Sequence, residues 1–187
     1  MNKIKMPNRP TLLYPAILAG ADVGGKPNYA TIGACGVVNL EPMLYISLKD
    51  THYTTSGVKE NGYFSVNIPS SDLALKTDLC GVVSGREFNK AELFTAFYDD
   101  AGNAPLIQEC PINMLCKVVQ TLPMSGFEMF FGEIVAVYIN EDCLTSGKLD
   151  PLKVNPMVMM YPDYFALGQV VGAVYQDGMA YKKSLSV

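Results

Sequence analysis

The sequence lacks the residues that several common classes of catalytic site require. It holds a single histidine, His52, which removes most histidine-based metal sites and argues against a serine–histidine–aspartate triad. Its five cysteines are scattered, and no two of them form a Cys-x-x-Cys pair. Zinc and iron–sulfur sites need closely spaced thiolates. We therefore expect reduced thiols and no metal centre.

Positive charge and long apolar runs are also scarce. Lys and Arg number 14 against 18 Asp and Glu, for a net charge of −4, whereas a nucleic-acid surface needs clustered cations. No apolar run approaches the roughly 20 residues of a membrane-spanning helix. Residues 1–10 lack the apolar core and cleavage site of a secretory signal. These features predict a cytoplasmic protein without nucleic-acid or membrane partners.

Sequence motifs for phosphate chemistry and proteolysis are missing as well. No Gly-x-Gly-x-x-Gly follows a strand, which argues against a Rossmann dinucleotide site. Neither a P-loop nor a His-Glu-x-x-His motif is present, and the carboxylates are scattered rather than paired for acid–base work.

What is present indicates one ordered domain that spans residues 1–187. Hydrophobic residues make up 49% of the chain and charged residues 17%, a balance typical of a globular core. Strand patterns separated by turn residues predominate, and no sustained alternation of strands and helices occurs. We therefore predict an all-β fold, a closed or nearly closed barrel with a few short peripheral helices. The expected strands cover residues 11–21, 28–38, 43–48, 63–68, 112–122, 127–140 and 157–160, and the expected helices follow residue 51 up to Gly62 and cover 71–83 and 149–154.

Two of these patterns carry further expectations. Helical spacing of Leu75, Leu79 and Val82 predicts the apolar stripe of the 71–83 helix, and residues 84–105 are expected to be mostly loop. Strict alternation over residues 127–140 places Glu133 on a largely apolar face of its strand.

Residues 30–36, Ala-Thr-Ile-Gly-Ala-Cys-Gly, form a strand built from small side chains. Small side chains let a ligand approach the backbone, and strand amides and carbonyls can match the polar edge of a flavin ring. Close packing of another strand is the alternative explanation, and composition alone slightly favours it.

Residues 47–55 pass from a strand end into a helix start and combine Lys49 and His52 with several hydroxyl groups. Free amides at a helix start, hydroxyl donors and one or two cations stabilise a phosphate. An ordinary helix cap with solvated charges is the alternative. The loop 84–90 also carries two cations, but a solvated loop is the simpler interpretation there.

In the order and spacing of its motifs, nearly the whole chain resembles the flavin reductase-like family of FMN-binding split barrels, which includes the flavoredoxins. The motifs that carry the resemblance are Gly-Lys-Pro-Asn at 25–28, Pro-Met-Leu-Tyr-Ile-Ser-Leu at 42–48, Tyr53-Thr54, Asn67-Ile68-Pro69, Ser84-Gly85 and Gly-Glu-Ile-Val at 132–135. The resemblance implies a Greek-key barrel of about six strands, a homodimer, and one FMN per subunit near the dimer interface.

The resemblance also implies which residues hold the cofactor. The small-residue strand would line the isoalloxazine ring, the strand-to-helix segment would hold the phosphate, and residues from two loops would approach the cofactor from the side. The FMN-binding residues implied are Thr31, Ile32, Gly33, Ala34, Cys35, Lys49, Thr51, His52, Thr54, Asn67, Ser84, Gly85 and Lys90. No residue is assigned a catalytic or metal-binding role.

The chain departs from the family pattern at two places. Asn89-Lys90-Ala91 stands where many relatives have Asp-Lys-Phe, and Lys49 stands where many have arginine. A lysine replaces a bidentate contact with a point charge, so we expect altered or weaker phosphate binding with the flavin retained. Cys35 is interpreted as a small packed thiol rather than a redox group.

The function implied is an FMN-dependent oxidoreductase that transfers hydride or electrons through the bound flavin, as a flavin reductase or a flavoredoxin-type carrier. Its electron donor would be NAD(P)H or another protein. Two alternatives remain: a non-catalytic module that binds FMN or haem, and an interaction protein whose barrel dimer is itself the functional product.

Overall fold

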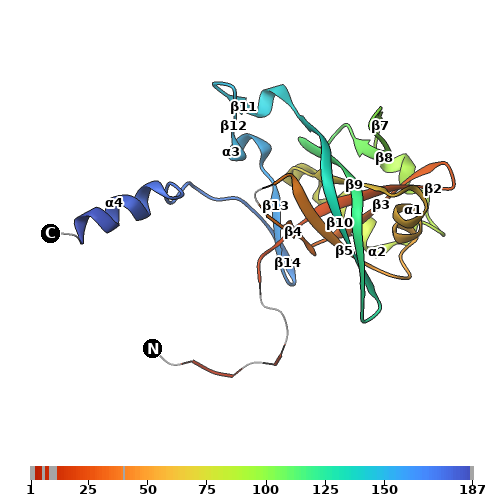
Figure 1. The fold of residues 1–187 in the computed structure, drawn as a ribbon, viewed down its shortest axis with the longest axis horizontal. Coiled ribbons are helices and arrows are strands. Elements are labelled where there is room, and N and C mark those ends of the chain that lie inside the picture. Colours follow the sequence, from red (N-terminus) through yellow and green to blue (C-terminus); the bar gives the residue numbers. More distant parts are fainter. Residues whose placement is uncertain (1–2, 6, 9–11, 40, 186–187) are drawn as a thin grey trace.

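A single curled antiparallel sheet forms the body of the protein (Figure 1). The computed structural model describes residues 3–5, 7–8, 12–39 and 41–185. The sheet has the strand order β3-β2-β6-β9-β10-β5-β4. Its members are β2 (Ile17–Val23), β3 (Lys26–Ile32), β4 (Cys35–Val37), β5 (Met43–Lys49), β6 (Tyr63–Ile68), β9 (Ile112–Met124) and β10 (Phe127–Ile139). The predicted all-β class is confirmed.

The two edges of this sheet belong to one run of the chain. β3 and β4 are separated only by Gly33 and Ala34, yet they lie at opposite ends of the strand order. The carbonyl of Ala34 accepts a hydrogen bond of 2.8 Å from the amide of Ser47. The strand expected over residues 28–38 is therefore bent, and it brings the two edges of the sheet to one segment. Counted as one bent strand, β3 and β4 leave six strands in the barrel.

Tight hairpins set the register of neighbouring strands. Gly24 and Gly25 join β2 to β3 with φ of 59° and 77°, and Ser125 and Gly126 join β9 to β10 with φ of 50° and 82°. Two-residue turns with positive φ match the twist of the flanking strands. Both turns were expected from the sequence.

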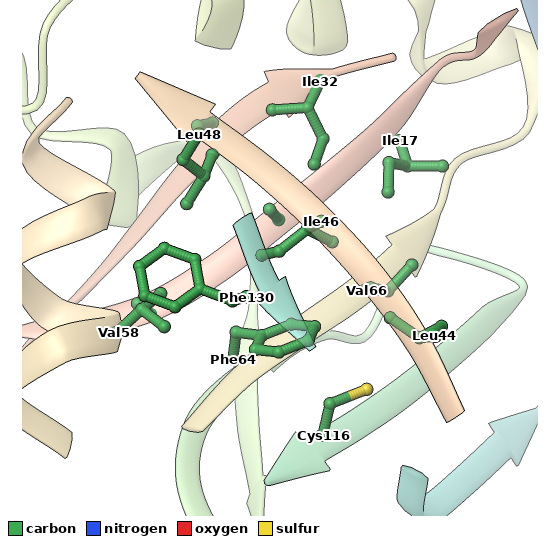
Figure 2. Packing of buried hydrophobic residues seen from close by; sticks show 13 residues of the cluster. Ile17, Ile32, Leu44, Ile46, Leu48, Val58, Phe64, Val66, Cys116 and Phe130 are labelled. Carbon is green, nitrogen blue, oxygen red and sulfur yellow. The ribbon is translucent and has the colours of Figure 1, made fainter. Parts of the chain in front are cut away.

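The barrel interior is apolar (Figure 2). Ile46, Phe64 and Phe130 are at most 1% exposed and come from three different strands. Gly132 lies so close to the Phe64 ring that an added Cβ would sit 2.6 Å from it. The absence of a side chain at Gly132 therefore lets β10 approach that ring.

Short helices cover the outside of the sheet, as predicted. α1 (Tyr53–Asn61) packs against β2 and ends at Gly62, whose φ is 70°. A 3₁₀ turn over Ser71–Leu73 leads into α2 (Ala74–Val82), which packs against β3. Two further 3₁₀ turns cover Lys90–Leu93 and Glu141–Cys143, and α3 covers Pro151–Val154.

The expected apolar stripe of α2 does not face the core. Leu75 and Val82 are 86% and 75% exposed, while Thr77 and Cys80 are buried. The hydroxyl of Thr31 donates a hydrogen bond to the carbonyl of Thr77. This tie to β3 accompanies an orientation in which Thr77 and Cys80 point inward and Leu75 and Val82 point outward.

Several elements were missed or misplaced by the sequence prediction. The expected loop over 84–105 contains the hairpin β7 (Ala96–Asp99) and β8 (Gly102–Ile107). The expected first strand divides at Ala16, after Pro15, into β1 (Tyr14–Pro15) and β2, and its Thr11 lies outside the described residues.

A second, smaller sheet lies beside the main one in the strand order β1-β13-β14. β1 pairs with β13 (Met157–Met160), which pairs with β14 (Asp163–Ala166). The short pair β11 (Leu144–Thr145) and β12 (Lys148–Leu149) and the terminal helix α4 (Gln176–Ser184) complete the elements.

The strict alternation expected along β10 is broken by bulges. The register against β9 shifts between Phe131 and Gly132 and again between Ile134 and Ala136. Ile134 consequently packs in the barrel interior, whereas Ala136 packs against the cluster under β8. Glu133, which was placed on a largely apolar face, precedes the second shift and is exposed.

None of the helices within the described part of the chain is both long and apolar enough to cross a membrane.

Candidate functional site

A cavity of about 290 Å³ opens where β3, the start of α1 and the end of α2 meet. We call it the site cavity. Hydroxyl, amide and cationic groups line it together with small apolar residues. Its lining residues are Asn28, Ala30, Thr31, Thr51, His52, Tyr53, Thr54, Cys80, Gly81, Val82, Val83, Ser84, Gly85 and Lys90.

The N-terminus of α1 gives the site cavity a positive electrostatic end. His52 is the N-cap residue, with extended backbone, and its side chain makes no capping hydrogen bond. The first turn of α1 carries no acidic residue. The first amides of a helix lack partners within the helix, and the helix dipole favours an anion beside them.

A buried ammonium group forms the opposite wall. Lys90 is 5% exposed, and its Nζ donates hydrogen bonds to the carbonyl of Tyr29 at 2.9 Å and to the carbonyl of Cys80 at 2.7 Å. Desolvation lowers the pKa of Lys90. No carboxylate of the described residues forms an ion pair with it. A buried charge without a counter-ion is costly, and the two carbonyl groups are the hydrogen-bond partners that offset part of this cost.

A second cavity of about 340 Å³ adjoins the first and shares Asn28, Tyr53, Gly85 and Lys90 with it. Arg86 lines this second cavity. Its guanidinium lies 5.0 Å from the Tyr53 ring centre, and Nη1 donates a 3.0 Å hydrogen bond to the carbonyl of Thr51. Arg86 therefore adds a cation beside the helix start and fixes the loop to it.

Close packing positions the loop after α2. The side-chain amide of Asn28 donates a 2.7 Å hydrogen bond to the hydroxyl of Thr54, and both residues are buried. A Cβ at Gly85 would lie 2.0 Å from Oδ1 of Asn28 and 2.8 Å from the Tyr53 ring. Only glycine lets the loop reach this depth, which explains the Ser84-Gly85 pair at this position.

An apolar cavity of about 260 Å³ continues from the site cavity and shares Thr31, Gly81 and Val82 with it. We call it the apolar cavity. Its other lining residues are Ala16, Ile32, Gly33, Asp78, Met159 and Tyr164. The two cavities together offer a cationic end and an apolar end along β3.

Three effects lower the pKa of His52. Desolvation by the surrounding chain is the largest, and the charges of Lys90 and Lys49 follow. The imidazole is therefore neutral at pH 7, and an anion placed between these cations would favour its protonated form.

The structure brings nine of the thirteen expected site residues to the two cavities. Those that line the site cavity are Thr31, Thr51, His52, Thr54, Ser84, Gly85 and Lys90, and those that line the apolar cavity are Thr31, Ile32 and Gly33. Gly33 also packs against Tyr14, where a Cβ would lie 2.8 Å from the tyrosine Cβ. Both explanations of the small-residue strand, ligand approach and close packing, therefore apply to it.

The other four expected residues line neither cavity. Lys49 is exposed and acts on His52 through its charge. Ala34 is exposed, and Cys35 packs against the barrel interior, where burial raises its pKa to about 11. Asn67 is fully buried, and its amide bonds to Leu18, Ser65, Ile107 and Asn113. Asn67 therefore belongs to a hydrogen-bond network in the interior of the fold.

Some lining residues were not assigned from the sequence. Asn28 was noted only within a turn motif, although a polar side chain inside a strand is a recognisable signal for a buried hydrogen bond. The residues from Cys80 to Val83 were missed because the sequence predicted that α2 faces the core with the stripe of Leu75, Leu79 and Val82. Tyr53 was noted within a motif, and Arg86 only as one of the two cations of the 84–90 loop.

The fold is that of a split-barrel protein, and its adjoining cavities join a cationic end to an apolar end. The family model "Flavin reductase like domain" matches residues 10–167, and the chain belongs to this family. Flavoredoxin from Methanosarcina acetivorans is 40% identical, with a TM-score of 0.92 over 97% of this chain and 100% of that one.

Two other relatives extend the comparison. Flavoredoxin of Desulfovibrio vulgaris (Miyazaki F) is 27% identical, with a TM-score of 0.87 over 94% of this chain and 100% of that one. The FMN reductase (NADH) RutF of Pantoea ananatis is 25% identical over 64% of this chain and 62% of its own length.

Proton titration of the single histidine tests the electrostatics of the site. We expect the C2–H resonance of His52 to titrate with a midpoint below 6.5, the ordinary value. Lys49→Met should raise that midpoint without restoring it fully, because desolvation is the larger cause. Lys148→Met, an exposed change on β12, should leave it unmoved. One-dimensional proton NMR of the apoprotein measures all three, and a wild-type midpoint at or above 6.5 would contradict the site as described.

Proposed function

We propose that the chain binds FMN along β3 and transfers hydride or electrons through it, as a flavin reductase or a flavoredoxin-type carrier. The observation that carries this proposal is the buried Lys90, which lines the same cavity as the uncapped start of α1 and has no carboxylate partner among the described residues. Family membership and the flavoredoxin relatives support a flavin as the ligand.

The residues of the site cavity fit the phosphate end of FMN. Lys90 and the first amides of α1 would hold the phosphate, with Thr51 and Thr54 as hydroxyl partners and Arg86 as a flanking cation. His52 would add a neutral imidazole donor at pH 7. Lys49 would contribute through its charge at longer range.

The apolar cavity fits the ring end of the same ligand. Val82 and Met159 offer apolar contact, and the small residues at Thr31 and Gly33 let a flat ring lie against the backbone of β3. Strand amides and carbonyls there would match the polar edge of the isoalloxazine. Because the ring and phosphate ends occupy adjoining cavities, FMN rather than riboflavin is the ligand we propose.

The chain's residues bind and orient the cofactor rather than perform the chemistry. When bound, FMN supplies hydride and single-electron transfer at its ring. Lys90 would neutralise the phosphate, the Asn28–Thr54 hydrogen bond holds the helix start against β3, and Gly85 lets the loop pack closely against Asn28 and Tyr53. Cys80, which lines the site cavity, has its pKa raised to about 11 by burial, so its thiol stays protonated at neutral pH.

The visible spectrum of the purified protein tests the proposed cofactor. We expect a yellow protein whose supernatant after denaturation contains FMN and no FAD by mass spectrometry. Bleaching by NADH, NADPH or a reduced protein carrier then identifies the donor and separates turnover from storage. A haem spectrum, or FAD in the supernatant, would refute the proposed ligand, and a colourless protein without affinity for FMN would favour a purely structural dimer.

Comparison of FMN with riboflavin tests the phosphate site. Lys90→Met should weaken FMN by about one to two decades, because a charge-assisted contact contributes roughly 1.5 to 3 kcal/mol. Riboflavin, which lacks the phosphate, should bind with nearly unchanged affinity. Fluorescence titration of the apoprotein measures both, and Lys148→Met serves as the charge-matched control.

Two other results would place the phosphate elsewhere. If Lys90→Met weakens both ligands equally, Lys90 supports the fold rather than the phosphate. If Arg86→Met has the larger selective effect on FMN, the phosphate lies in the second cavity.

We also propose that the protein is a homodimer. The outer face of β5, β10 and β9 near their hairpin carries the apolar residues Tyr45, Leu122, Met124, Phe127, Met129 and Phe131, with the polar residues Ser47, Lys49 and Gln120 among them. Met124 and Phe127 are 53% and 45% exposed. Contiguous apolar surface of this kind marks an interaction site, and a two-fold axis would bury it against itself.

A charge placed in this face should prevent association. Phe127→Asp should convert a dimeric mass into a monomeric mass at micromolar concentration, because pairing would bury an unpartnered carboxylate. Leu149→Asp, on a similarly exposed residue of β12, should leave the dimer intact. Light scattering measures both, and a monomeric wild-type chain would contradict the proposal.

A further inference from the structure

A further cavity, of about 370 Å³, lies where the β7–β8 hairpin meets the start of β9 and the end of β10. We call it the carboxamide cavity. It shares no lining residue with the site cavity, the second cavity or the apolar cavity. Figure 1 shows β7 and β8 well apart from β13 and β14. Its volume suits a small molecule, and its lining residues are Phe97, Gln108, Asn113, Tyr138, Ile139 and Asn140.

Asn113 presents a fixed hydrogen-bond acceptor to this cavity. The residue is 3% exposed, and its Nδ2 donates hydrogen bonds of 2.8 Å to Oδ1 of Asn67 and to the carbonyl of Ile107. Oδ1 of Asn67 also accepts a 3.0 Å hydrogen bond from the amide of Ile107, which identifies it as an oxygen. Two acceptors therefore fix which end of the Asn113 amide faces the network.

The other end of that amide has no partner. Both hydrogens of Nδ2 are used, and Oδ1 of Asn113 accepts no hydrogen bond from the described residues. Solvent reaches this oxygen, because it is not among the fully enclosed unpaired atoms of the described chain. A deeply placed acceptor without a protein partner is uncommon. Since Asn113 lines the carboxamide cavity, the group that completes its bonding comes from that cavity.

Two more carboxamides line the same cavity from other segments. Gln108 and Asn140 are exposed, and their side-chain amides have no hydrogen-bond partner among the described residues. Their backbones are held: the amide of Gln108 donates 2.9 Å to the carbonyl of Thr95, and that of Asn140 donates 2.9 Å to the carbonyl of Pro111. Each free carboxamide can both donate and accept.

Aromatic rings supply an apolar wall. Phe97 and Tyr138 pack edge to face, with ring centres 5.3 Å apart and planes at 88°. The hydroxyl of Tyr138 donates a hydrogen bond to Asp99, which anchors that ring. No charged side chain lines the cavity, and the carboxylate of Asp99 beside the wall would repel an anion.

We propose that the carboxamide cavity binds a neutral polyhydroxylated ligand of about the size of a monosaccharide. A hydroxyl group both donates and accepts, so it matches each carboxamide and supplies the donor that Oδ1 of Asn113 lacks. A carboxylate or phosphate group would supply only acceptors there. The C–H face of a sugar ring can lie against an aromatic side chain, whereas perpendicular rings leave no parallel slot for a nucleobase. This inference does not depend on the flavin.

Heteronuclear NMR of the side-chain amides in the isotopically labelled full-length protein tests the site. The neutral probes are glucose, galactose, methyl glucoside and inositol, and the comparison probes are glucuronate and uracil. We expect at least one neutral probe to shift the side-chain amides of Gln108, Asn113 and Asn140 saturably, with a Kd in the millimolar range. Glucuronate should bind more weakly than glucose, because the cavity has no cation to receive its carboxylate.

Variants at the two exposed carboxamides separate a site from general solvent effects. Gln108→Ala and Asn140→Ala should each weaken the binding of that probe at least about threefold, because each removes a hydrogen bond. Asn103→Ala, an exposed change on β8 outside the lining, is the matched control and should leave the affinity unchanged.

Three results would overturn the proposal. The first is no saturable shift with any neutral probe at tens of millimolar, which means that water alone fills the cavity. The second is tighter binding of glucuronate or uracil than of any neutral probe. The third is equal affinity in wild type, Gln108→Ala and Asn140→Ala.

The outcome is separable from that of the flavin experiments. Lys90→Met, which should weaken FMN, should leave the affinity for the neutral probe unchanged, because Lys90 lines only the other cavities. A yellow protein without sugar binding refutes the carboxamide site and leaves the flavin site standing. A colourless protein that binds the neutral probe supports the carboxamide site and refutes the flavin.

Discussion

The fold depends on one steric constraint, the bend between β3 and β4. The same run of chain serves both edges of the sheet, so it must pass closely under its neighbours at two points. A Cβ at Gly33 would lie 2.8 Å from Cβ of Tyr14, and a Cβ at Gly36 would lie 2.9 Å from the Tyr45 ring. Real Cβ atoms essentially never come so close. A side chain at Gly33 would displace Tyr14 of β1, and one at Gly36 would displace the ring of Tyr45 on the neighbouring β5. The bend also sets Thr31 against α2, which creates the wall shared by the two cavities.

Electrostatics then separates the two ends of the site. The ammonium group of Lys90 is buried, and its hydrogen-bond partners are two uncharged backbone carbonyl groups. Carbonyl dipoles offset part of the desolvation of an ammonium but supply no net negative charge. The desolvation that the carbonyl groups do not offset lowers the pKa of Lys90. A bound anion would remove that penalty, and the start of α1 places further positive potential at the same point. The chain as a whole has a net charge of −4, so the positive potential is confined to the neighbourhood of this site.

Local patterns predicted the strands and hairpins well and predicted α2 badly, for physical reasons. Residues 63–68 and 157–160 carry period-two or β-branched patterns bounded by turn residues, and the structure has strands over those same residues. The leucines of α2 gave a regular helical stripe, yet the helix turns Thr77 and Cys80 inward. The hydrogen bond from Thr31 that fixes this orientation joins residues 46 positions apart, and no local pattern contains it.

Asn67 was assigned to the cofactor through the resemblance alone, whereas its buried amide ties β6 to three other segments. Cavities lined by both loops and strands, such as the site cavity, arise only when such distant contacts form.

The thiols of Cys80 and Cys35 are unsuited to redox chemistry at neutral pH, because burial raises the pKa of each. Cys80 lies in the site cavity beside Lys90, whose charge lowers the pKa of that thiol. Burial opposes this effect and is larger, so the pKa rises to about 11. Cys35 follows the same rule at about 11, by burial alone. At pH 7 both are protonated and poor nucleophiles. The site cavity has one imidazole that is neutral at pH 7, one buried thiol and no carboxylate among its lining residues, and Asp78 lines the adjoining apolar cavity. The site therefore supplies position and charge but few reactive groups. Such a site is suited to a cofactor whose ring performs the transfer itself.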